Sequence, residues 1–143
     1  FAGVGCHSGR PDYTVNVQKS DPAEVLRKLG DGFGAAVVVD CTGVSAALKQ
    51  SLELVRPLGT VVKIGWGPQP LNFSLDPLVA KAATLQGSFS HTYATWERVL
   101  QLMASGQLKL DPMIGGVYPL DEWEAGFQGM AGGSNIKSVL VYA

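Results

Sequence analysis

The fold of this chain is decided by the stretch Ala35-Ala36-Val37-Val38-Val39-Asp40-Cys41-Thr42-Gly43. It opens with a short apolar run, rich in β-branched valine, that is bounded by Gly34 and Asp40. A continuous run of this kind is typical of a strand that is buried on both faces, as in a parallel sheet. We therefore predict a strand from Ala35 to Val39 that leads directly into a turn of small residues.

Two further apolar runs follow at intervals that leave room for helices. The next strand is predicted from Thr60 to Ile64, and another from Thr84 to Phe89. Between the first two strands, a helix from about Ser45 to Val55 carries apolar residues at helical spacing. Strands and helices that alternate in this way form right-handed crossovers and a parallel sheet. The predicted fold class is therefore α/β, with these three strands side by side and pointing in one direction.

The remaining segments also divide into strands and helices. The predicted strands run from Thr14 to Val17, Leu71 to Leu75, Met113 to Tyr118 and Ser138 to Tyr142. The predicted helices begin at Pro22 (after the N-cap Asp21), Asp76, Tyr93 and Asp121. The helix from Tyr93 has the clearest apolar face, and the alternation from Leu71 to Leu75 indicates a short strand with one exposed face.

Composition excludes several classes of protein. The chain has 143 residues, which suits one domain or part of one, and its 46% hydrophobic and 16% charged residues exclude a disordered chain. A formal net charge of −1 without a basic stripe argues against binding to nucleic acid or to an acidic membrane surface. Cys6 and Cys41 are too few for a disulfide framework, so the expected compartment is a reducing cytoplasm.

The candidate binding site follows from the predicted sheet. Ligands of open parallel sheets bind beyond the carboxyl ends of the strands. The segments at those ends are Asp40 to Gly43, Gly65 to Gly67 and Ser88 to Ser90. All three contain small residues, which let a ligand approach the backbone closely.

Five segments of the chain stand out by their order and spacing. They are Tyr13 to Val17, Val37 to Gly43, Leu54 to Val62, Gly87 to Ser90 and Asn135 to Lys137. Together they resemble the carboxyl-terminal part of zinc-dependent medium-chain alcohol dehydrogenases, near the sorbitol and threonine dehydrogenases. The resemblance covers about Asp12 to Val141, and its specificity lies in the five segments together.

This resemblance implies a partial, N-terminally truncated Rossmann-type parallel sheet with flanking helices in three αβα layers. It divides the chain into an unmatched leader (residues 1–11), a partial dinucleotide-binding region (12–91) and a helix-strand-helix-strand extension (92–143). The reaction of the parent family is hydride transfer between an alcohol and NAD or NADP, with zinc polarising the alcohol oxygen.

The resemblance also assigns cofactor contacts. The assigned residues are Cys41, Thr42 and Gly43 along the cofactor, Ile64, Gly65 and Trp66 on the nicotinamide side, Ser88, Phe89 and Ser90 at the carboxamide, and Lys137 near a phosphate. Fixed backbone groups suit a carboxamide, and a positive charge suits a phosphate. Trp66 is open to a second interpretation, as a contact for a protein partner, and His91 is expected to be a polar residue near a helix start.

The chain departs from the family pattern in two ways. The phosphate-binding G-x-G-x-x-G unit is missing, because Gly3, Gly5 and Gly9 have the wrong spacing. The zinc ligands are missing too. Cys6 and His7 are adjacent, neighbouring residues rarely both face one metal, and no third ligand has suitable spacing. We therefore expect no catalytic residue and no metal site in the chain, an inactive isolated chain, and weak or absent binding of NAD or NADP.

Truncation has a physical consequence for the surface. Without its neighbours, the strand from Ala35 to Val39 becomes an open edge that seeks pairing. We expect a homodimer, with Leu71, Phe73 and Leu75 in a strand that pairs across a two-fold axis as in the family, or association with a missing N-terminal fragment. The alternative functions are a non-catalytic oligomerisation module and a small-ligand binder around Gly65, Trp66 and Phe89.

Overall fold

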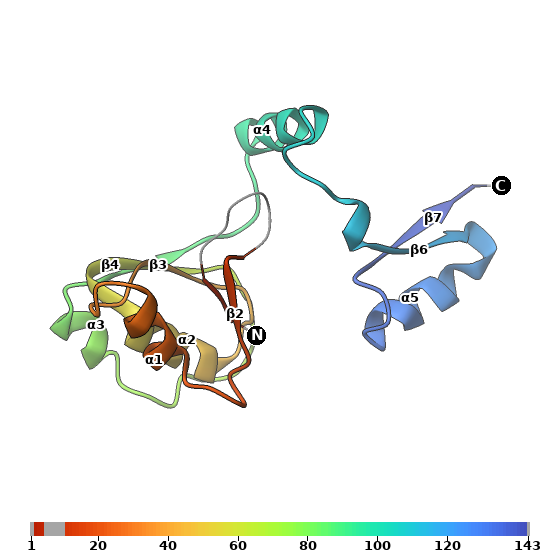
Figure 1. The fold of residues 1–143 in the computed structure, drawn as a ribbon. Coiled ribbons are helices and arrows are strands. Elements are labelled where there is room, and N and C mark those ends of the chain that lie inside the picture. Colours follow the sequence, from red (N-terminus) through yellow and green to blue (C-terminus); the bar gives the residue numbers. More distant parts are fainter. Residues whose placement is uncertain (1, 5–10, 143) are drawn as a thin grey trace. The chain divides into compact units, whose positions relative to one another are not determined.

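The computed structural model describes residues 2–4 and 11–142 (Figure 1). The chain divides into two compact units, Phe1–His91 and Thr92–Ala143. Each unit has its own parallel strand pairing and its own helices, so each is described by itself.

The centre of the first unit is a parallel sheet of three strands. β3 (Ala35–Asp40), β4 (Val55–Lys63) and β5 (Thr84–Gly87) lie in the order β3-β4-β5. The register pairs Asp40 with Lys63 and Lys63 with Gly87, so the carboxyl ends of all three strands lie in line. The prediction of three strands side by side and in one direction is confirmed.

Helix α2 (Ser45–Leu54) forms the crossover from β3 to β4 and supplies the core. Leu48 and Leu52 of α2 are 1% exposed, and Val55 and Val61 of β4 are fully buried. Helices α1 (Pro22–Leu29) and α3 (Asp76–Ala80) both contact α2. These four side chains form the apolar core between α2 and the sheet, and their burial stabilises the unit.

The other face of β3 is open, which corrects the expectation of a strand buried on both faces. Val37 and Val39 are 59% and 52% exposed, whereas Val38 packs against the core. The reason is that α2 covers one face of β3 and that β4 pairs with one edge of it. Among the described residues, β3 lies at an edge of the three-stranded sheet, as expected for this strand.

The end of α2 is held by a lysine. The Lys81 ammonium donates hydrogen bonds to the carbonyl oxygens of Leu52, Glu53 and Val55 at 2.8, 2.8 and 2.7 Å. The last carbonyls of a helix have no partner within the helix, so a cation at this place satisfies them.

β4 begins at once after α2, earlier than predicted, and Leu58 takes up a left-handed conformation with φ 60°.

Two predicted strands come out differently. β2 (Tyr13–Val15) is shorter than the strand predicted from Thr14 to Val17, and it pairs antiparallel with β1 (Ala2–Val4), within the segment expected to be an unmatched leader. Residues 71–75 form an irregular segment, so the predicted strand is wrong for the single chain. Phe73 packs against the core while Leu71 and Leu75 are 46% and 40% exposed, which explains the alternation without a strand. A strand requires a neighbour for its backbone groups, and the described residues offer none here.

The second unit contains α4 (Tyr93–Ala104), β6 (Ile114–Pro119), α5 (Trp123–Ala131) and β7 (Lys137–Val141), with short 3₁₀ turns at Asp111–Met113 and Leu120–Glu122. β6 and β7 pair in parallel around the α5 crossover. The Ser138 hydroxyl donates to the Gly126 carbonyl at 2.8 Å, and the Tyr118 hydroxyl lies 2.7 Å from the Asn135 amide. The first bond attaches α5 to β7, and the second attaches β6 to the turn between α5 and β7.

Candidate functional site

Three turns meet at the carboxyl edge of the β3-β4-β5 sheet. Residues 41–43 follow β3, residues 64–67 follow β4, and residues 88–90 follow β5. Because the three strand ends are in register, the turns lie next to one another. The structure thus brings every predicted site residue of the first unit to one edge of the sheet, as expected for an open parallel sheet.

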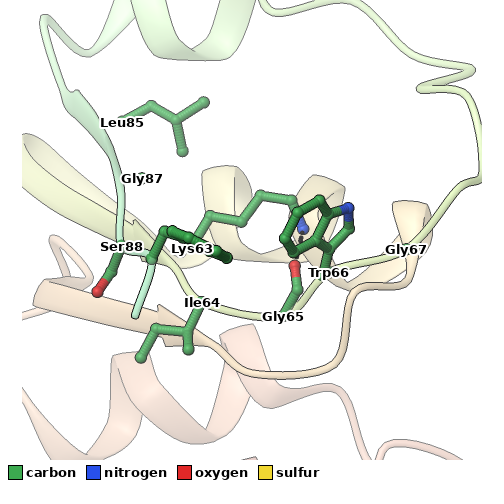
Figure 2. A pocket seen from close by; sticks show the side chains of 9 residues that line it. Lys63, Ile64, Gly65, Trp66, Gly67, Leu85, Gly87 and Ser88 are labelled. Carbon is green, nitrogen blue, oxygen red and sulfur yellow. Dashed lines mark hydrogen bonds between the residues drawn. The ribbon is translucent and has the colours of Figure 1, made fainter. Parts of the chain in front are cut away.

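A cavity of about 710 Å³ opens at this edge (Figure 2). Its lining consists of Lys63, Ile64, Gly65, Trp66, Gly67, Leu85, Gly87, Ser88 and Phe89. The volume falls within the range of small-molecule and cofactor sites, about 300–1,000 Å³. Of the predicted residues, those after β4 and β5 line the cavity, with the exception of Ser90. Of the residues after β3, Gly43 contacts the backbone of the turn at residues 65–67, which lines the cavity.

Glycines allow the turns after β3 and β4 to touch through their backbones. A Cβ on Gly65 would lie 2.1 Å from the Gly43 nitrogen, and a Cβ on Gly67 would lie 2.1 Å from the Gly43 oxygen. Gly43 itself has a φ of 72°, a conformation that side chains disfavour. The two turns are therefore in direct backbone contact, and any larger residue at these positions would force them apart.

An ion pair joins the last residues of β3 and β4, directly before these two turns. The Asp40 side chain is 1% exposed, and its Oδ2 lies 3.3 Å from the Lys63 ammonium. Asp40 Oδ1 accepts hydrogen bonds from the Thr42 N–H at 2.9 Å and from the Thr42 hydroxyl at 2.8 Å. The Lys63 ammonium also donates to the Gly65 carbonyl at 2.8 Å. Each charge is thus paired and hydrogen-bonded, which burial of a carboxylate requires.

The electrostatic environment keeps Asp40 ionised. Burial by itself would raise the pKa of the Asp40 carboxyl, but the two hydrogen bonds from Thr42 and the Lys63 ammonium outweigh it. The pKa of Asp40 therefore lies below its ordinary value. The backbone adds to the junction, because the N–H groups of Ile64 and Gly65 donate to the Asp40 carbonyl at 2.8 and 2.9 Å.

Two aromatic side chains form the rim of the cavity. Trp66 and Phe89 are 83% and 79% exposed, and their rings meet edge to face with centroids 5.4 Å apart. Ser90, directly after Phe89, has a left-handed backbone conformation with a φ of 57°. An exposed aromatic pair beside backbone polar groups suits a flat ligand that is apolar on its faces and polar at its edge.

The other predicted residues belong to other segments of the chain. Lys137 is the first residue of β7 in the second unit, and His91 directly precedes Thr92, the N-cap of α4. Cys6 and His7 lie outside the described residues, as do the glycines at 5 and 9.

Neither a metal site nor a membrane span occurs in the described part of the chain. Within residues 2–4 and 11–142, no group of three or more histidine, cysteine, aspartate or glutamate side chains could hold a metal ion. No helix among these residues is long and apolar enough to cross a membrane.

Sequence reasoning overlooked Lys63 as a site residue and Asp40 as its partner. A signal existed, because each is a charged residue near the carboxyl end of a largely apolar run, and the two strands were predicted to be neighbours. Opposite charges in such positions pair across parallel strands when the register aligns them, as it does here.

Comparison with known proteins adds a family. A model of the family described as zinc-binding dehydrogenase matches residues 8–105. The chain is 36% identical over 128 residues to the uncharacterized zinc-type alcohol dehydrogenase-like protein YdjL of Escherichia coli, and 31% identical over 130 residues to a sorbitol dehydrogenase of Halalkalibacterium halodurans. Each alignment covers 90% of this chain but 36% and 38% of the respective relative. The chain thus spans little more than a third of these proteins.

Solved structures agree on the fold. The alcohol dehydrogenase TADH from Thermus sp. ATN1 matches with a TM-score of 0.82 and 27% identity, over 90% of this chain and 38% of that one. An alcohol dehydrogenase from Thermotoga maritima matches with a TM-score of 0.88 over 95% of this chain and 39% of that one. Its identity of 24% supports the fold alone.

Proposed function

This chain belongs to the zinc-binding dehydrogenase family, and from that premise we propose that its first unit forms part of the nicotinamide pocket of an NAD- or NADP-dependent alcohol dehydrogenase. The observation that carries the proposal is the cavity at the carboxyl edge of the parallel sheet, lined by the turns after β4 and β5. Cofactors of open parallel sheets bind at this edge.

The residues present fit a nicotinamide ring. Its flat face suits the apolar wall made by Ile64, Trp66, Leu85 and Phe89, and its carboxamide suits the backbone groups of the turns at residues 64–66 and 88–90. When bound, the nicotinamide supplies the hydride acceptor or donor for an alcohol or its carbonyl product. The protein's task is to hold the ring and to exclude water from one side of it.

Zinc does not fit the described residues of this chain. Its usual site needs at least three histidine, cysteine or carboxylate ligands, and residues 2–4 and 11–142 bring no such group together. Cys41 is an exposed thiol in the turn after β3. We propose that the chain supplies cofactor contacts and no metal site, so that on its own it oxidises no alcohol and binds a dinucleotide weakly.

The pocket can be tested with the two halves of the cofactor. Amide chemical shifts of the chain are followed by NMR during titration with nicotinamide mononucleotide and, separately, with adenosine monophosphate. We expect the nicotinamide half to shift the amides of residues 64–67 and 87–90 and the adenosine half to leave them unchanged. Equal shifts from both halves, or none from either at millimolar concentration, would contradict the proposal.

We also propose that two copies of the chain associate through residues 71–75. Leu71 and Leu75 are exposed in the single chain, and the backbone there pairs with no strand of the described residues. A second copy would complete the strand that the alternating sequence favours. Light scattering after size exclusion should give a dimer that Leu71→Asp dissociates and that Val17→Asp, at another exposed position, leaves intact. A stable 15.1 kDa monomer at high concentration would refute the pairing.

A further inference from the structure

The Lys63 side chain holds an unusual place in the cavity wall. It is a cation that lines a mainly apolar pocket, yet Figure 2 shows the side chain extending along the cavity to the Gly65 carbonyl, to which its ammonium is bonded. The same ammonium lies 3.3 Å from the buried Asp40 carboxylate. Its charge is thus directed into the protein and is balanced there.

We propose that the Asp40–Lys63 pair positions the turn that carries Trp66 and balances the affinities of the pocket for the oxidised and the reduced nicotinamide ring. This inference rests on the proposed function, because it names what the same cavity selects. Asp40 and Lys63 act as positioning and specificity-determining residues, with no part in the chemical step.

The positioning role follows from the peptide geometry. The Lys63 ammonium holds the Gly65 carbonyl at 2.8 Å, and the peptide that joins Gly65 to Trp66 is planar and trans. Fixing the carbonyl therefore also fixes the direction of the Trp66 N–H. The Gly65 N–H is held by the Asp40 carbonyl at 2.9 Å, so the turn is anchored on both sides of Gly65.

The selective role follows from charge. The oxidised nicotinamide ring carries one positive charge and the reduced ring carries none, while the remainder of the cofactor is the same. A lone Lys63 in the wall would repel the oxidised ring, and a lone Asp40 would attract it. As a pair the two side chains contribute almost no net charge, so the pocket tolerates both forms of the cofactor, which a reversible hydride transfer requires.

The test uses the whole protein that carries these residues and measures the dissociation constants of the oxidised and reduced dinucleotides by calorimetry at pH 7.5. Asp40→Asn leaves the positive charge of Lys63 without its partner, while the amide oxygen of the new side chain can still accept hydrogen bonds from Thr42. We expect this variant to weaken binding of the oxidised dinucleotide relative to the reduced one by about fivefold, which is the size of a partly screened interaction between unit charges. Lys63→Met should shift this ratio in the opposite direction by a similar factor.

Two further variants keep the test independent of stability. The double variant Asp40→Asn with Lys63→Met carries neither charge, so it should return the ratio to within about twofold of the original even if it binds both forms less tightly. Lys81→Met removes another lysine that bonds backbone carbonyls, at the opposite end of β4. It should lower stability and leave the ratio unchanged.

The outcomes separate the two proposals. If neither form binds the original protein, the proposed function is wrong and the inference falls with it. If both forms bind and the two single variants leave the ratio unchanged, or move it in the same direction, the pair has no selective role and the inference alone is overturned. Opposite shifts that cancel in the double variant support it.

Discussion

Replacement of Gly65 by alanine tests the central feature of the site, which is the backbone contact between the turns after β3 and β4. A Cβ on Gly65 would lie 2.1 Å from the Gly43 nitrogen and 2.5 Å from the Thr42 nitrogen, whereas ordinary contact begins at 3.4 Å. The turns would have to separate by 3.4 − 2.1 = 1.3 Å. The obstacles are backbone atoms, which cannot turn aside as a flexible side chain can.

The cost can be estimated from this displacement. A shift of that size would stretch the 2.9 Å bond from the Gly65 N–H to the Asp40 carbonyl beyond hydrogen-bonding distance. Overpacking costs about 1–3 kcal/mol, and the lost hydrogen bond adds about 1 kcal/mol. We therefore expect Gly65→Ala to lower the free energy of unfolding by about 3 kcal/mol.

Gly87 provides the matched control, because it lines the same cavity but a Cβ added to it would meet nothing within 4 Å. Gly87→Ala should change the free energy of unfolding by less than about 0.5 kcal/mol. Urea unfolding of the original chain and both variants, followed by circular dichroism, gives the comparison. A Gly65→Ala variant within about 1 kcal/mol of Gly87→Ala would show that the turns are not in tight contact.

Three further predictions concern other parts of the first unit. Because the pKa of the Asp40 carboxyl is lowered on folding, its stabilising contribution is present above the unfolded pKa and is lost as pH falls. Urea unfolding at several pH values should therefore show that the difference in unfolding free energy between the original chain and Asp40→Asn shrinks below about pH 4. A difference that stays constant with pH would contradict this. Leu48→Ala should cost about 3 kcal/mol, since Leu48 is 1% exposed, against less than about 1 kcal/mol for the exposed Leu100→Ala in the same assay. Lys81→Met should cost about 1–3 kcal/mol by leaving the end of α2 without its donor, and a variant as stable as the original would refute that role.

Much of the sheet could be predicted because its causes are local. An apolar, β-branched run such as residues 35–39 has few other ways to bury itself, and the helix between two such runs forces a parallel crossover. The position of the site follows from the same logic, since the ends of parallel strands meet at one edge. This is why Gly65, Trp66 and Phe89 could be assigned to a common site from the order of segments.

Elsewhere the pattern was ambiguous, and the failures show why. The alternation in residues 71–75 suits a strand as well as an irregular segment with one buried residue, and only the packing of Phe73 distinguishes them. Similarly, the apolar character of β3 predicted two buried faces, but burial depends on what covers a strand. In the first unit α2 covers one face, so Val37 and Val39 remain exposed.

The sequence by itself determined the α/β alternation, the parallel crossovers and the edge at which a ligand would bind, because these depend on periodicity and chain direction. Only the tertiary structure decided that Asp40 and Lys63 pair, that Gly43 touches Gly65 and Gly67, and that Trp66 meets Phe89. Those contacts join residues 22 to 24 positions apart through the register of neighbouring strands. Register is a property of the assembled sheet, since each strand alone is compatible with several alignments against its neighbour.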